Sequence, residues 1–246
     1  MTPAHLRALT DARGRRQLSV LLTRLDDGAQ HLLIEQHGTL SPGSDDAALD
    51  ATLCQAAAQS AGSVRSGVTV LDGVSWFIQV HAPPPRLILV GAVHVAQALA
   101  PLATGLSMAV TVVDPRGGFA TAARFPGVAL LELWPDEALA LLAPDRHSAI
   151  VTLSHEARLD DPALHAALSG PAFYVGALGS RRTQAARRER LAALGHDATA
   201  LARLHGPVGL AIGAIGPGEI ALSIMAEIIA VRRGAAPASA SGSAGG

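Results

Sequence analysis

The chain has 246 residues with 19 basic and 20 acidic side chains, so its formal net charge is −1. All the basic side chains are arginines, and the absence of lysine excludes a lysine Schiff base and a phosphate-binding lysine. Near-neutral charge and only 3% aromatic residues argue against nucleic-acid binding and against binding to an anionic membrane. The single cysteine, Cys54, cannot form an internal disulfide or a multi-cysteine metal site, and it fits a cytoplasmic location.

Residues 1–82 have the pattern of a small α+β domain. We expect four strands, paired in two hairpins, at residues 17–25, 30–35, 68–71 and 74–80. A helix is predicted between the hairpins, at residues 45–61, where Cys54 falls in a stripe of alanines and is expected to be buried and inert. No stretch in residues 1–16 is apolar and long enough for a signal peptide.

The proline run 83–85 is the predicted boundary, and residues 86–234 show a different pattern. Short Val/Ile/Leu runs alternate with helical stretches, and we expect strands at residues 87–90, 109–113, 129–133, 149–153 and 173–175. Continuous apolar strands separated by helices are typical of a Rossmann-like, doubly wound parallel sheet. A final helix is predicted at residues 217–233, and the Ala/Ser/Gly-rich tail 235–246 is expected to be disordered.

Residues 87–113 carry no formal charge, but they are interrupted by Gly91, His94, Gln97 and Pro101. This favours a buried strand–helix–strand unit over a membrane span.

The first segment that could carry chemistry is LILVGAVHVAQALA, followed by VTVVDPR. Gly91 ends a strand, His94 starts a helix and Asp114 closes the next strand, which is the spacing of a dinucleotide-binding unit. Val93 stands where that fingerprint expects its second glycine, and Ala96 stands at the third. The fold assignment is therefore better supported than NAD(P) binding, and His94 could also only satisfy backbone groups.

The second segment is YVGALGSRRTQAARRERL. Gly176 and Gly179 form a turn after a strand, and Ser180 is predicted to cap the following helix. Arg181 and Arg182 would add guanidinium groups to that helix start, so we predict binding of a phosphate or another oxyanion. The remaining arginines of the helix, at positions 187, 188 and 190, are expected to form a solvated surface.

The third segment, LHGPVGLAIGAIGPGEI, is rich in glycine and precedes the last helix. His205 and Gly206 open it, and His205 could bind a ligand or only fix the loop. In SHEARLDDPAL, His155 follows a predicted strand at the edge where doubly wound sheets bind ligands. Asp160 and Asp161 are expected to cap the next helix.

Together these segments resemble the xanthine dehydrogenase accessory factor family (XdhC/CoxI). The resemblance covers residues 85–234 and, more loosely, GTLSPGSDDAALDATL in the first domain, with GALGSRR and HGPVGL as the specific motifs. It implies a maturation factor that binds the molybdenum cofactor (molybdopterin) and assists its sulfuration, with a cysteine desulfurase as helper. The cofactor would then be inserted into an apo molybdenum hydroxylase such as xanthine dehydrogenase.

The chain also departs from its relatives. Some of them have a cysteine in the stretch that matches residues 41–46, which has none here. Relatives commonly read Asp-Ile-Gly-Ala-Arg-Thr-Pro at positions 211–217, where this chain has Ala211 and Ile215 in place of the acid and the arginine. Two other functions stay open: an NAD(P)-dependent oxidoreductase and a protein-binding scaffold. The sequence also leaves a homodimer open.

Overall fold

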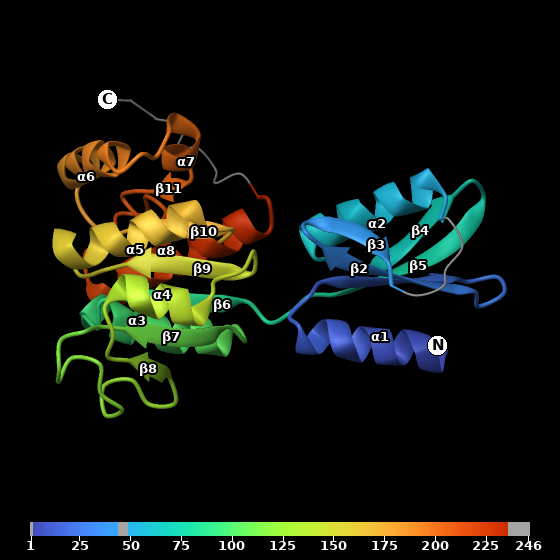
Figure 1. The fold of residues 1–246 in the computed structure, drawn as a ribbon, viewed down its shortest axis with the longest axis horizontal. Helices are drawn as coiled ribbons and strands as arrows, with labels where there is room; N and C mark the ends of the chain where they lie inside the picture. The colour runs from blue at the N-terminus through green and yellow to red at the C-terminus, as the bar shows by residue number, and fades with distance from the viewer. Residues whose placement is uncertain (1, 44–48, 236–246) are drawn as a thin grey trace, which may run out of the picture. The chain divides into compact units, whose positions relative to one another are not determined.

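The computed structural model describes residues 2–43 and 49–235, and the chain divides into two compact units, Met1–Pro83 and Pro84–Gly246. Figure 1 shows both, and each is described by itself. The expected tail at residues 236–246 and the expected start of a helix at residues 45–48 lie outside the described residues.

The first unit is an antiparallel sheet with a helix on each face (Figure 1). Its elements are α1 (Pro3–Gly14), β1 (Ser19–Arg24), β2 (Gln30–Gln36), β3 (Thr39–Pro42), α2 (Ala51–Ser63), β4 (Gly67–Leu71) and β5 (Val74–His81). The strand order is β3-β2-β1-β5-β4. Successive side chains of β1 point to opposite faces of the sheet. Val20 and Leu22 therefore pack in the core under α2, and Leu21 packs in the core under α1.

Two elements of this unit, α1 and β3, were not expected from the sequence. Helix α1 begins where the side chain of Thr2 accepts a hydrogen bond from His5 N–H, with Pro3 at the first helical position. The burial predicted for Cys54 is wrong: Cys54 is half-buried, and its neighbours Leu53 and Ala57 face the core instead.

The second unit contains the predicted doubly wound sheet. Its elements are β6 (Arg86–Val90), α3 (His94–Gly105), β7 (Ala109–Val113), β8 (Ala129–Leu131), α4 (Pro135–Leu142), β9 (Ser148–Thr152), α5 (Ala157–Ser169), β10 (Tyr174–Ala177), α6 (Arg181–Ala193), α7 (Ala198–Ala202), β11 (Leu204–His205) and α8 (Pro217–Arg232). The six strands are parallel, in the order β11-β10-β9-β6-β7-β8. This is the dinucleotide-fold order 3-2-1-4-5-6 read from the other edge, and its switch point lies between β6 and β9.

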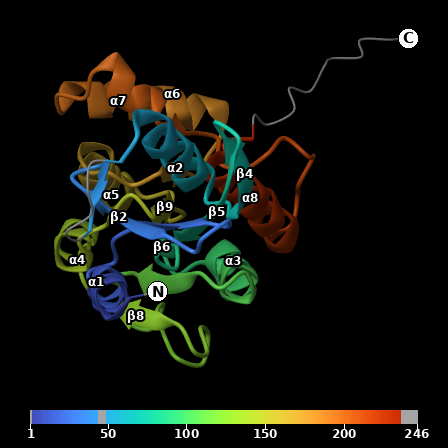
Figure 2. The ribbon, with the colours of Figure 1, turned by 90° about the vertical axis from the view of Figure 1, so that its right-hand side faces the viewer.

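Helices cover both faces of this sheet, which explains why its central strands are continuously apolar. Figure 2 shows α3 and α8 on one side and α4 and α5 on the other. Leu87 and Leu89 of β6 pack with α3 and α8, whereas Ile88 and Val90 pack with α4 and α5. Within the described residues, no helix is both long enough and apolar enough to span a bilayer.

Candidate functional site

All the site residues predicted from the sequence lie in the second unit, and most of them follow the carboxyl end of a strand. They are Gly91, His94, Asp114, His155, Gly176, Gly179, Ser180, Arg181, Arg182, His205 and Gly206. Because the strands are parallel, their carboxyl ends share one edge, where doubly wound folds bind ligands. The contacts divide these residues into a group at the switch point and a group around β10, α6 and β11.

At the switch point, the turn after β6 touches the turn after β9. Gly91 has φ +104°, and a Cβ there would lie 2.9 Å from the backbone nitrogen of Ser154. Glycine is therefore required at position 91 both for its backbone conformation and for this close approach. His94 starts α3 and is exposed, and His155 is exposed in a left-handed conformation.

Asp114 is fully buried, and both carboxylate oxygens are already hydrogen-bonded. Ala92 N–H donates to Oδ2 over 2.8 Å, and Arg116 donates through its backbone N–H and its guanidinium group. Burial raises the pKa of Asp114, but these hydrogen bonds outweigh it and keep the pKa below its ordinary value. Its carboxylate thus holds the turn after β6.

Arg116 also connects the ends of β7 and β9. Its Nη1 lies 2.5 Å from Oε1 of Glu156, the N-cap residue of α5, and its guanidinium group lies over the ring of Phe119 at 4.4 Å. Glu156 also pairs with Arg158, whose Nε lies 2.9 Å from Glu156 Oε2. These ion pairs run between the carboxyl ends of two strands that flank β6 in the sheet.

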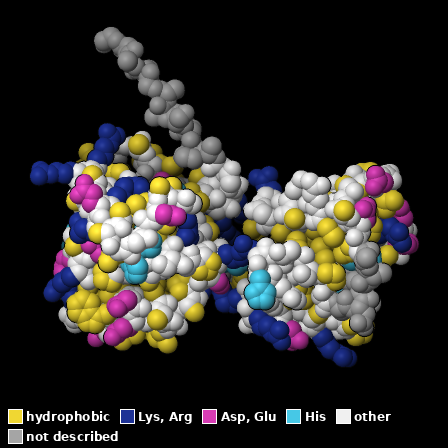
Figure 3. All heavy atoms as spheres, turned by 45° about the horizontal axis from the view of Figure 1, so that its top comes forward, with side chains coloured by type: hydrophobic (Ala, Val, Ile, Leu, Met, Phe, Trp, Pro, Cys, Tyr) yellow, Lys and Arg dark blue, Asp and Glu magenta, His cyan; other side chains and the backbone are white. Residues whose placement is uncertain are grey.

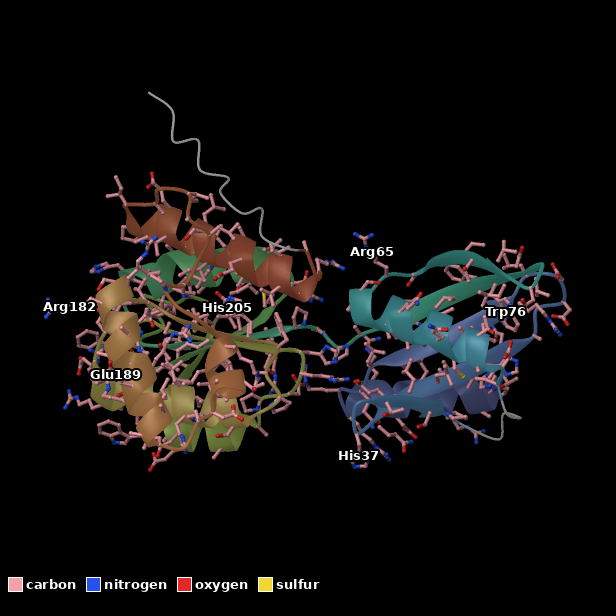
Figure 4. All side chains as sticks on the ribbon, turned by 90° about the horizontal axis from the view of Figure 1, so that it is seen from above. His37, Arg65, Trp76, Arg182, Glu189 and His205 are labelled. Atoms are coloured by element: carbon pink, nitrogen blue, oxygen red, sulfur yellow. The ribbon has the colours of Figure 1, made fainter. Side chains whose placement is uncertain are left out.

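The predicted cap of α6 is present. Ser180 Oγ accepts a hydrogen bond from Thr183 N–H, and Gly179 precedes it with φ +140°. Arg181 and Arg182 occupy the first turn and are exposed, and neither has a hydrogen-bond or ion-pair partner within residues 2–43 and 49–235. Figure 4 shows Arg182 pointing away from the body of the unit. This helix start therefore presents free N–H groups and two unpaired guanidinium groups to solvent.

Behind this helix start lies a buried polar network that the sequence did not reveal. Arg187 Nη2 lies 2.9 Å from Asp160 Oδ2, with side-chain exposures of 2% and 0%. Ser154 Oγ donates to the other Asp160 oxygen over 2.6 Å, and Arg187 Nη1 donates to Gln184 Oε1. Burial raises the pKa of Asp160, and Ser154 and Arg187 oppose that rise. The network joins the turn after β9 to α5 and α6.

Two expectations about these charged residues are therefore wrong. Arg187 is buried and Arg188 is half-buried and donates to the carbonyls of Leu201 and Leu204, so neither belongs to a solvated surface. Arg190 is exposed, as expected, and pairs with Asp161. The acids do not cap α5, because Glu156 occupies the N-cap position. Side-chain pairing across two helices decides these positions, and spacing within one helix does not reveal it.

Gln184 brings the β10 and β11 ends together. Its Nε2 donates to the carbonyl of Ala177 over 2.8 Å, and a Cβ on Gly206 would lie 2.5 Å from its Oε1. On the α8 side of the sheet, a Cβ on Gly176 would lie 2.6 Å from Val208 Cγ2. The glycines at 176 and 206 thus allow close packing, which is a sufficient reason for glycine at both positions.

His205 belongs to a separate cluster with Tyr174 and Glu227. Its ring stacks on Tyr174 at 4.4 Å between centroids, and its Nδ1 lies 3.2 Å from Glu227 Oε1. The other carboxylate oxygen, Oε2, accepts bonds from the Tyr174 hydroxyl and from Gly209 N–H. Burial raises the pKa of Glu227, but these three donors outweigh it and leave the pKa below its ordinary value. An ionised carboxylate only accepts, so this contact is a hydrogen bond in the His205 tautomer that has its proton on Nδ1.

The structure does not bring His205 to the arginine pair. Figure 4 shows its side chain well separated from Arg182 within the same unit. Glu227 was missed in the sequence because it sits in a mostly apolar helix, far along the chain from its partners. Only a lone acid among the apolar residues of IALSIMAEIIAV could have marked it.

Comparisons with known proteins agree with the sequence resemblance. A Bacillus subtilis protein named as a probable xanthine dehydrogenase subunit is 37% identical over 158 residues, 64% of this chain and 46% of that protein. The uncharacterized protein YqeB of Escherichia coli is 36% identical over 162 residues, 66% of this chain and 30% of that protein. The molybdenum cofactor insertion chaperone PaoD of Escherichia coli is 38% identical over 80 residues, 32% of this chain and 25% of that protein. The matches span less than half the length of these relatives.

A solved structure shows the same fold. A crystal structure described as a xanthine dehydrogenase from Bacillus halodurans matches with a TM-score of 0.67 and 21% identity, over 94% of this chain and 67% of that chain. The sequence profile described as the XdhC Rossmann domain matches residues 87–228, more than half of the chain. The chain therefore belongs to the xanthine dehydrogenase accessory factor (XdhC) family, as its motifs indicated.

Proposed function

We propose that this protein is a maturation factor that binds the molybdenum cofactor and assists its sulfuration and insertion into a molybdenum hydroxylase. One observation carries the proposal: an XdhC Rossmann domain presents two unpaired arginines, Arg181 and Arg182, on a capped helix start. A relative named as a molybdenum cofactor insertion chaperone supports the choice of cargo.

The donors at this helix start fit the phosphate of molybdopterin. An anion there would meet the free N–H groups of the first turn and the positive end of the helix dipole. Arg181 and Arg182 supply planar guanidinium groups that bind phosphate oxygens in pairs. Ser180 is occupied in capping, so its role is to hold the turn open to the ligand.

The remaining predicted site residues have a supporting role in this proposal. Asp114 and Gly91 shape the switch point, and Gly176, Gly179 and Gly206 allow the close packing beside α6. His94 and His155 are exposed at the same edge of the sheet and are available to a bound cofactor. His205 belongs to the Glu227 cluster and is a less suitable partner for a ligand held by Arg182.

The proposed partners are an apo molybdenum hydroxylase and, for the sulfido ligand, a cysteine desulfurase in the cytoplasm. The Bacillus subtilis relative, named after xanthine dehydrogenase, is the reason for choosing a hydroxylase of that class. In this role the protein acts as a cofactor-binding chaperone, and the hydroxylase performs the catalysis.

An NAD(P)-dependent oxidoreductase is the second candidate, favoured by the strand order and by Asp114 at the end of β7. The position of Asp114 weakens it, because a carboxylate that already accepts from Ala92 and Arg116 has no free oxygen for a ribose hydroxyl. Calorimetry with millimolar NAD(H) and NADP(H) tests this candidate, and measurable binding would restore it.

Co-expression tests the proposed function directly. A molybdenum hydroxylase is expressed with and without this protein, and its activity and sulfido content are measured. The protein is also purified and heated with an oxidant, and the fluorescence of released pterin is recorded. We expect a more active, more sulfurated hydroxylase and a pterin signal. Equal activity and sulfuration in both strains would refute the proposal.

A further inference from the structure

Five residues at helix α4 form an exposed surface, here called the α4 face: Trp134, Leu141 and the acids Glu132, Asp136 and Glu137. Trp134 is the N-cap residue of α4 and is 45% exposed, and Leu141, one residue before the helix end, is 67% exposed. The helix buries its other side through Pro135, Ala138 and Leu139. Large apolar side chains on the outer side of a helix whose inner side is already packed do not serve the core of their own domain.

Spacing places these side chains together. Glu137 and Leu141 are four residues apart in α4 and lie on one face of the helix, and Trp134 directly precedes its first turn. Glu132 and Asp136 are exposed beside them. Figure 3 shows hydrophobic and acidic side chains adjoining at the lower left of this unit.

The acids of this face have no side-chain partner in the part of the chain that the structure describes. Glu132, Asp136 and Glu137 form no hydrogen bond or ion pair through their side chains with any described residue. An exposed tryptophan bordered by unpaired charges has the composition of a protein interface, where aromatic anchors fill a pocket and charged residues form the rim.

The negative charge of the α4 face indicates which kind of partner can bind there. A second copy of this chain, docked through the same patch about a two-fold axis, would bring like carboxylates together. Nucleic acid and anionic lipid are repelled for the same reason. The face fits a protein surface with an apolar pocket bordered by arginine or lysine.

We propose that the α4 face is the docking surface for the apo molybdenum hydroxylase, which would present that basic-rimmed apolar pocket. The identity of this partner rests on the proposed function. Trp134 is the anchor, because a buried tryptophan contributes more binding energy than other interface residues, and the acids accelerate association at low salt.

Binding of the purified full-length chain to the apo-hydroxylase tests this assignment by calorimetry. The variants are Trp134→Ala, Leu141→Arg and Glu137→Lys. Matched controls are Leu194→Arg, at the C-cap residue of α6, which is 52% exposed, and Glu189→Lys, at an exposed acid of α6 labelled in Figure 4. Trp134 makes no side-chain cap hydrogen bond, so its replacement leaves the helix start intact. Thermal melts confirm that each variant is folded.

We expect Trp134→Ala and Leu141→Arg to weaken binding by about tenfold or more. Glu137→Lys should weaken it severalfold and reduce its salt dependence, whereas both controls should bind like the unchanged chain. A complex of unchanged affinity in all three variants would overturn the docking surface and leave the proposed function intact. Self-association that the variants abolish would assign the face to a second copy. No complex, together with a hydroxylase equally active without this protein, would overturn both proposals.

Discussion

The guanidinium group of Arg187 lies 2.9 Å from the carboxylate of Asp160, and both side chains are buried. This pair joins α6 to α5, and Ser154 extends it to the turn after β9. The helix start at Ser180, the proposed anion site, thus lies two turns before a buried ion pair on the same helix. Stability and the proposed function can therefore be separated by mutating different arginines of α6.

Removing one partner of the buried pair should strongly destabilise the second unit. We expect Arg187→Ala to lower the free energy of unfolding by about 3–5 kcal/mol, because Asp160 would keep an uncompensated buried charge. Urea denaturation of purified protein measures this. Arg190→Ala is the control on the same helix, since its pair with Asp161 is 43% exposed on the arginine side and should contribute less than about 1 kcal/mol. Equal effects of the two substitutions would contradict this prediction.

Gly91→Ala should also destabilise the unit. The new Cβ would lie 2.9 Å from Ser154 N on a backbone with φ +104°, so either the turn after β6 or the turn after β9 must move. We expect a loss of about 1–3 kcal/mol in thermal or urea unfolding. Gly218→Ala is the control, because nothing lies within 4 Å of a Cβ at that position in α8. A neutral Gly91→Ala variant would show that the two turns are not held in contact.

Replacing the two exposed arginines should change ligand binding and leave stability unaltered. We expect Arg181→Ala and Arg182→Ala each to weaken binding of molybdopterin by roughly tenfold, since each removes a charged hydrogen-bond donor. The melting temperature should stay the same, because both side chains are exposed. Arg65→Ala, at an exposed arginine of the first unit labelled in Figure 4, is the control. Unchanged binding in the double variant would favour the protein-binding scaffold.

Glu227 should give the protein an acid-sensitive component of stability. Its pKa in the folded protein lies below the ordinary value of 4.5 because of three hydrogen-bond donors. Its contribution is fully present above that value and is lost as pH falls through the folded pKa. The stability difference between the unchanged chain and Glu227→Gln should therefore be constant near neutral pH and shrink in acid, as measured by urea denaturation across pH. Glu189→Gln, at an exposed acid, should show no such dependence.

Much of the fold was predictable because it follows from local patterns. Runs such as LILV and AIVTL predicted buried parallel strands, and the Ser180 cap and the α8 start at Pro217 followed from residue type and position. Helix α1 was not predicted because its sequence, PAHLRALTDARG, has few apolar residues, and strand β3 was not predicted because it is only four residues long. The buried face of α2 was misassigned because its alanines line more than one side of the helix, so their spacing does not fix which side faces the sheet.

The sequence by itself determined the family, the parallel sheet and the helix start capped by Ser180. These depend on motif spacing, hydrophobic periodicity and capping, which are properties of neighbouring residues. Only the tertiary structure decided which charges are free. Arg182 has no ion-pair partner among the described residues, while Arg187, five residues later, is buried against Asp160, because pairing depends on which helix packs alongside. The Glu227 cluster could not be predicted for the same reason, that its contacts depend on tertiary packing. Its members at positions 174, 205, 209 and 227 meet only after the sheet and α8 pack together.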